Sequence, residues 1–290
     1  MNLSAPVRQR GFSLTEIMIT LAMGIFISAG IVQVMSSNQV TDRLNRAIAS
    51  TQESGRFIVS RLRSDLLPAG RYDILDPALD ASVDIVDEAA FVQNRPVILA
   101  GDFSQNLTLG SVQGFSGADD QLVVAMQGER DCRGYKLGYA DDAEFFVVNH
   151  YFVDAGTLKC RGFDGRVLRG QKIAVGNNND AAFTILDNVI SFQVLYGVSA
   201  SSESGNFTGT PTTYVTASAL AALRAAGSHV VAIRVAILLE GDSETYINPT
   251  PTFKLLNEAS ITPSGNGLYK KFETTITLRN MKNYARRQKA

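Results

Sequence analysis

An uncharged apolar stretch near the N-terminus constrains this chain more than any other feature. No charged residue occurs between Ile17 and Val34, and the clearly polar side chains within it are Thr20, Ser28 and Gln33. A run of about 18 apolar residues is long enough to cross a bilayer as a helix. A core helix of that length in a soluble protein usually keeps a polar stripe, which these scattered residues do not form. We therefore expect a membrane-spanning helix here.

The residues that flank this stretch predict its orientation. Arg8 and Arg10 precede it, and such positive charge places that end of the helix in the cytoplasm. The rest of the chain would then lie in the periplasm or beyond. A secretory signal peptide is a poor alternative, because Ser28-Ala29-Gly30 is followed by more apolar residues where a cleavage site should end the run. We therefore expect the helix to remain as a single-pass anchor in the inner membrane.

A carboxylate stands at the edge of the apolar run. An ionised Glu16 is costly there unless it is paired, so its presence is a hypothesis about function. From Gly11 to Glu16 the sequence is Gly-Phe-Ser-Leu-Thr-Glu, with a basic leader before it and the apolar helix after it. This arrangement resembles the class III signal of type IV prepilins.

The resemblance implies how the N-terminus is processed. In that family a prepilin peptidase cuts on the cytoplasmic side after the glycine, here Gly11, and methylates the new N-terminal amine, here that of Phe12. Glycine suits such a narrow cleavage site because it has no side chain to obstruct it. Glu16 becomes the fifth mature residue and is expected to pair with the N-terminal amine of a neighbouring subunit. Gln33 stands where many major pilins have proline, so the helix melting known for major pilins is not implied.

A helical pattern continues beyond the apolar run and ends near Pro68 and Gly70. A helix from about Phe12 to Leu67 would be roughly 80 Å long. We divide the chain into a leader (1–11), a transmembrane and filament-core half of the helix (12–35), an amphipathic half (36–67) and a β-rich globular domain (68–290). The stripe of the amphipathic half follows three- and four-residue steps through Val40, Leu44, Ile48, Thr51, Gly55, Ile58, Leu62 and Leu66.

Alternating apolar and polar residues downstream predict half-buried, antiparallel strands. Ser199–Thr213 and Asn248–Gly267 are expected to be loops, and Ala217–Ala226 a short helix that ends at Gly227. The predicted fold class is α+β and pilin-like, with the long N-terminal helix packed on an antiparallel sheet. The expected strands are Leu122–Met126, Glu144–Val153, Leu158–Arg161, Ile190–Val198, Val231–Leu239 and Phe272–Leu278.

The two cysteines of the chain, Cys132 and Cys160, are expected to form a disulfide, because the domain is predicted to be periplasmic. The size of the chain, this mid-chain pair and the closing stretch Thr274–Asn280 resemble the PilW-type minor pilins. That resemblance implies a low-copy subunit near the tip that helps to initiate a type IV pilus. The implied partners are the prepilin peptidase, the major pilin, other minor pilins, the inner-membrane assembly platform and a large tip-associated adhesin.

Two other functions compete with this interpretation. One is a J-like pseudopilin of a type II secretion system, which shares the N-terminal motif and the fold. The other is a membrane-anchored enzyme or ligand-binding domain, for which the sequence offers no catalytic motif and only two histidines, His150 and His229. We predict no catalytic residues and no cofactor. A net charge of −1 argues against a nucleic-acid partner.

Two clusters of oxygen-bearing side chains were considered as calcium sites. They are the stretch 177–180, which reads Asn-Asn-Asn-Asp, and the acidic group of Asp141, Asp142 and Glu144. Neither has the spacing of an EF-hand, and turns rich in Asn and Asp explain both clusters more simply. We predict no metal site.

Overall fold

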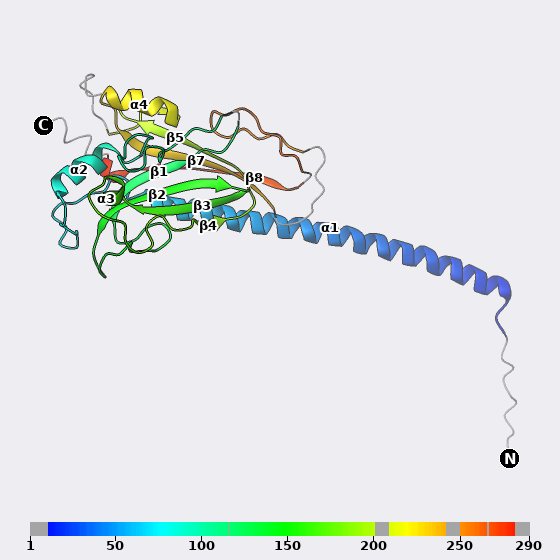
Figure 1. Cartoon of the computed structure of the whole chain (residues 1–290). Helices are drawn as coiled ribbons and strands as arrows, with labels where there is room; N and C mark the ends of the chain where they lie inside the picture. Colours follow the sequence, from blue (N-terminus) through cyan, green and yellow to red (C-terminus); the bar gives the residue numbers. More distant parts are fainter. Residues whose placement is uncertain (1–10, 116, 201–208, 242–249, 266, 282–290) are drawn as a thin grey trace, which may run out of the picture.

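The computed structural model describes residues 11–115, 117–200, 209–241, 250–265 and 267–281. Residues 1–10 of the leader and parts of both predicted loops (201–208, 248–249 and 266) lie outside the described residues. The described chain consists of a long N-terminal helix and a head of two antiparallel sheets (Figure 1). The α+β fold class that the sequence predicted is confirmed.

Helix α1 runs from Leu14 to Leu66, 53 residues without interruption. It begins two residues later than the sequence predicted, because Ser13 adopts an extended backbone and caps the first turn. It ends just before Pro68, where the next residues turn the chain into the head. Figure 1 shows the N-terminal half of α1 projecting from the head as a bare rod.

The first sheet has the strand order β1-β2-β3-β4, and every pairing in it is antiparallel. Its strands are β1 (Leu122–Gly128), β2 (Phe145–Asp154), β3 (Thr157–Asp164) and β4 (Phe183–Leu186). The second sheet has the order β6-β5-β7-β8 and is also antiparallel. Its strands are β5 (Val189–Val198), β6 (Thr213–Val215), β7 (Val230–Glu240) and β8 (Tyr269–Thr277).

The six predicted strands are all present, within a few residues of their expected bounds. The structure differs in dividing them between two sheets. It also buries both faces of β5, where the sequence indicated a half-buried strand. The polar Ser191 and Gln193 are buried because neighbouring segments cover them, and the Gln193 amide donates to the Ala118 carbonyl at 2.9 Å. The alternation of apolar and polar residues along β5 therefore does not correspond to one buried face and one exposed face.

Three short helices complete the head. Helix α4 (Ala217–Ala225) agrees with the sequence prediction. Helices α2 (Ile85–Asn94) and α3 (Gly165–Leu168) were not predicted. The sequence does contain a helix-start signal for α2, an aspartate at the N-cap position. The Asp84 carboxylate accepts hydrogen bonds from the backbone N–H groups of Val86 and Asp87.

The main hydrophobic core lies between the two sheets and the C-terminal half of α1. It contains Ile58, Leu62 and Leu66 of α1 together with inward-facing residues of both sheets, such as Val147 and Val235. A second cluster lies on the other face of the first sheet, beneath α2. The head therefore covers the predicted apolar stripe of α1 from Thr51 to Leu66, whereas Val40 at the start of that stripe is 65% exposed.

Candidate functional site

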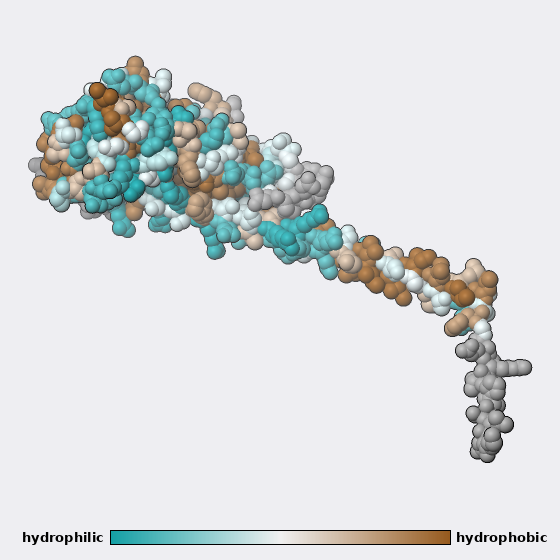
Figure 2. Space-filling view, turned by 60° about the horizontal axis from the view of Figure 1, so that its bottom comes forward, coloured by the Kyte–Doolittle hydropathy of each residue, from teal (hydrophilic) through white to brown (hydrophobic). Residues whose placement is uncertain are grey.

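The N-terminal half of α1 presents a continuous apolar surface that the head does not cover. The large apolar side chains from Phe12, just before the helix, to Val40 are between 54% and 80% exposed. By length and composition α1 can cross a membrane. Figure 2 shows this apolar rod, followed by a polar stretch before the head begins. A soluble monomer would not leave so large an apolar surface in water, so this half of α1 requires a lipid or protein environment.

The residues of the predicted cleavage motif lie at the very start of this rod. Gly11 and Phe12 are exposed and precede the helix, and no atom lies near the position that a Gly11 side chain would occupy. The Ser13 hydroxyl accepts a hydrogen bond from the Glu16 N–H at 3.2 Å. The Thr20 hydroxyl donates to the Glu16 carbonyl at 2.9 Å. The predicted cleavage motif is thus accessible and adjoins a helix that is capped by Ser13.

Glu16 occupies the third position of the helix. Ser13 and Glu16 match the serine-to-glutamate spacing of a capping box. A carboxylate in the first turn also interacts favourably with the helix dipole. Within the described residues, the Glu16 carboxylate is exposed and has no ion-pair partner. Its position therefore serves the helix locally and leaves the charge available to a neighbouring molecule.

The C-terminal half of α1 is fixed to the head by close packing. The helix buries Ala47, Thr51, Gly55 and further residues at three- and four-residue steps up to Leu66. Gly55 lies against the ring of Phe272 on β8, where any side chain would overlap that ring. Glycine therefore allows the helix and the second sheet to approach closely.

A polar contact joins α1 to the disulfide. Arg61 donates to the Asp65 carboxylate at 2.9 Å and to the Cys132 carbonyl at 2.8 Å. The Tyr151 hydroxyl donates to the same carboxylate at 3.1 Å. Burial raises the pKa of Asp65, although Arg61 and Tyr151 oppose that effect. These bonds fix the direction in which α1 leaves the head.

Cys132 and Cys160 form the disulfide that the sequence predicted, with their Cα atoms 6.4 Å apart. Cys160 lies on β3, and Cys132 lies in the loop between β1 and β2. Both are buried in the main core. The bond therefore attaches this loop to the middle of the first sheet.

Several of the candidate catalytic and calcium-binding residues have structural partners. His150 contacts the Gln121 side-chain oxygen at 3.0 Å and packs on Phe152, and burial lowers its pKa to about 4, with the charge of Arg161 adding to the effect. Glu144 pairs with Arg71 at 2.9 Å. The Asn178 side chain accepts from the Asp164 N–H at 2.7 Å. In the part of the chain that the structure describes, no three His, Cys, Asp or Glu residues are arranged to hold a metal ion.

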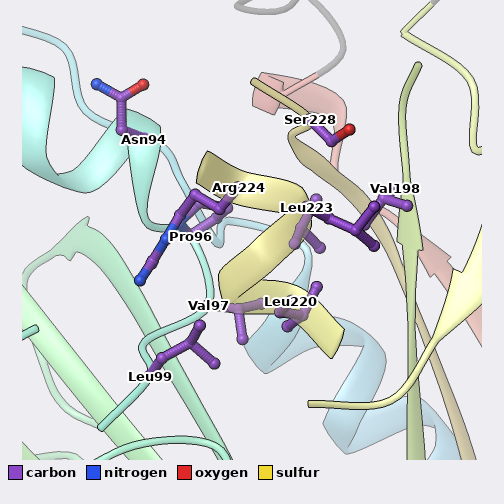
Figure 3. Close-up of a pocket in the computed structure, with 10 residues that line it drawn as sticks. Asn94, Pro96, Val97, Leu99, Val198, Leu220, Leu223, Arg224 and Ser228 are labelled. Carbon is purple, nitrogen blue, oxygen red and sulfur yellow. The ribbon is translucent and has the colours of Figure 1, made fainter. Parts of the chain in front are cut away.

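A small hollow beneath α4 is shown in Figure 3. Leu220, Leu223 and Arg224 of α4 line it together with residues such as Val97, Leu99 and Val198. Its volume is about 10 Å³, which is room for about one water molecule. Small-molecule sites are usually at least about 300 Å³, so this hollow is a packing defect and not a ligand site.

Residues 145–280 match the family model of the type IV pilus-assembly protein W, PilW. The chain is a type IV pilus-related, pilin-like protein. The match extends from the start of β2 to just beyond β8, so it is independent of the N-terminal motif. The resemblance to PilW-type pilins that the sequence indicated is thereby confirmed. The match is to a pilus-assembly family and not to a family of enzymes.

Two further comparisons add little to this assignment. A search of curated proteins gave no match. Among solved structures, a type IV-like pilin from Thermus thermophilus, TTHA1219, aligns with a TM-score of 0.33 and 14% identity. That alignment covers 59% of this chain and 83% of the Thermus chain. At so low a score the likeness carries no argument here.

Proposed function

We propose that this protein is a minor pilin that takes part in initiating a type IV pilus, at low copy and near the tip. The observation that carries the proposal is the uncovered apolar half of α1, joined to a head that matches the PilW family. Such a subunit can wait in the membrane and later bury the same surface among the helices of a filament. The prepilin motif beginning at Gly11 supports this two-stage path.

The proposal assigns a place to each part of the chain. The leader lies in the cytoplasm, the apolar half of α1 crosses the inner membrane, and the head is periplasmic until the filament is exported. The disulfide supports a periplasmic head, because such bonds persist in oxidising compartments. A prepilin peptidase cuts after Gly11 and methylates Phe12. Glu16 then pairs with the amine of a neighbouring subunit, and misaligned subunits would leave that charge unpaired.

The size of the head favours an end position in the filament. The head comprises about 220 of the 290 residues, so its bulk is easier to place at the tip than in a crowded helical lattice. Its neighbours would be the major pilin and other minor pilins, with the assembly platform below.

The test combines the mature N-terminus with the phenotype of a deletion. In cells with an active prepilin peptidase, mass spectrometry of the membrane-extracted protein should find an N-methylated Phe12 as the first residue. Deleting the gene should abolish or sharply reduce surface pili, and a plasmid copy should restore them. An intact Met1 would refute the processing. Normal pili together with blocked export of a folded enzyme would assign the protein to the secretion pseudopilins instead.

A further inference from the structure

The outer face of the second sheet is covered over only part of its area. Residues 250–262 lie across one end of that face and bury Ala236, Leu238 and Tyr269 under Leu255. At the edge of this covered part, an open groove of about 450 Å³ lies between residues 254–257 and the strands. The groove is lined by Leu195, Arg234, Lys254, Leu256, Asn257, Lys271 and Glu273.

Strand register places Arg234 in the middle of this face. It lies between Leu195 of β5 and Thr275 of β8, each of which is its direct partner in the sheet. The Arg234 Nε donates to the Thr275 hydroxyl at 3.0 Å, and the guanidinium lies 4.2 Å from the centre of the Tyr214 ring. Among the described residues, no carboxylate is within ion-pair distance of Arg234. The side chain is therefore held in place without an ion pair to any described residue.

Two lysines add to the positive charge of the groove. The Lys271 ammonium donates to the Lys254 carbonyl at 3.2 Å and lies 3.6 Å from the Glu273 carboxylate. Lys254 itself is exposed and has no ion pair in the part of the chain that the structure describes. Three cations and one anion give the lining a formal charge of +2 (3 − 1), in a chain whose net charge is −1. Positive potential is thus concentrated locally.

The groove also has apolar surface. Leu195 is buried at its floor, and Leu256 forms part of its wall. Leu256 has a φ of 50°, a left-handed conformation that residues with a side chain rarely adopt. Such strain is found disproportionately at binding sites. The groove therefore combines a fixed guanidinium, two lysines and a leucine in a strained conformation.

We propose that this groove binds an acidic segment of a neighbouring pilus subunit, a proposal that rests on the function proposed above. A carboxylate of that segment would accept charge-assisted hydrogen bonds from Arg234 and the lysines. An adjacent apolar side chain would pack on Leu195 and Leu256. A nucleic acid is disfavoured, because the cations form a short cluster with Glu273 among them and the chain as a whole is not basic.

The experiment uses the full-length chain in pilus-forming cells. A photo-crosslinking amino acid, p-benzoylphenylalanine, replaces Asn257 on the rim of the groove, and in a second strain it replaces Ile27 on the apolar half of α1. From the Asn257 position we expect an adduct whose cross-linked peptide, identified by mass spectrometry, carries Asp or Glu and belongs to another subunit of the same pilus. Arg234→Glu should lower the adduct yield about tenfold, as expected when a charge-assisted hydrogen bond is lost.

Matched variants separate binding from folding. Arg130→Glu reverses an exposed charge near the disulfide and should leave the yield unchanged. If Arg234→Glu lowers the melting temperature, Lys254→Glu carries the same test, because that side chain is exposed. Changing the partner's cross-linked acid to Lys should restore the adduct to the Arg234→Glu variant.

The outcomes distinguish the two proposals. An adduct from Ile27 but none from Asn257 would overturn the groove proposal and leave the minor-pilin function in place. An Asn257 adduct that is insensitive to Arg234→Glu and Lys254→Glu, or one formed with nucleic acid, would also overturn it. If neither position captured a pilus subunit, both proposals would fail together.

Discussion

A fully buried ion pair joins Arg166 and Glu88 in the head. Both side chains are fully buried, and Arg166 donates to the Glu88 carboxylate at 2.8 Å and 3.0 Å. The Tyr72 hydroxyl donates to the same carboxylate, and Asp80 accepts further bonds from Arg166. Burial, and after it the contact with Glu88, raises the pKa of Tyr72, so the phenol remains a donor at neutral pH. The network connects α2 and α3 beside the first sheet.

Replacing Arg166 by Met removes the charge at similar volume and leaves Glu88 buried without a cation. Breaking a buried pair in this way costs about 3–5 kcal/mol. At about 2–4 °C for each kcal/mol in a domain of this size, the melting temperature should fall by roughly 6–20 °C. Thermal unfolding of the detergent-purified full-length protein, followed by circular dichroism, measures this shift.

Two control variants test whether the lost stability comes from the unpaired Glu88 carboxylate. Arg46→Met breaks an exposed pair with Asp42, whose side chains are 79% and 60% exposed, and should cost at most about 0.5 kcal/mol. Arg166→Met combined with Glu88→Met removes both charges and should recover much of the lost stability. If Arg166→Met shifted the melting temperature no more than Arg46→Met does, the stability of the head would not depend on pairing the buried Glu88 carboxylate with Arg166. No recovery in the double variant would mean that the loss came from packing.

Three further predictions concern the disulfide, assembly and pH. Replacing both Cys132 and Cys160 by Ser should cost about 3.5 kcal/mol for a separation of 28 residues, measured by urea unfolding, and free thiols in protein taken from the periplasm would contradict the bond. Glu16→Ala should be retained in the membrane but enter sheared filaments about tenfold less than wild type, whereas Glu53→Ala should enter normally; equal incorporation would remove support for the pairing. Burial raises the pKa of Asp120 to about 6 from 3.8, so this group's contribution to stability should fall as pH rises from about 4 to about 6 and then level off. A carboxyl NMR titration of Asp120 with a midpoint below 4 would contradict this.

Strands β4 and β6, which the sequence did not predict, depend on partners elsewhere in the chain. Strand β4 has four residues and is held by its pairing with β3, in which a register shift separates Thr184 from Leu186. Strand β6 has three residues and borders β5. Such short segments carry too little periodicity to be recognised. The division into two sheets was missed for a similar reason, because alternation along a strand does not say which other strands it joins.

The sequence by itself determined the long helix and the motif at its start. Both are local: an apolar run needs only its own length to indicate a helix, and the stretch from Gly11 to Glu16 is contiguous. Tertiary structure alone decided the groove on the second sheet. Leu195, Arg234 and Lys271 come from β5, β7 and β8: strand register pairs Leu195 with Arg234, and Lys271, the partner of Leu238, lines the same groove. Register is set by the packing of the whole sheet, which no single segment of the chain encodes.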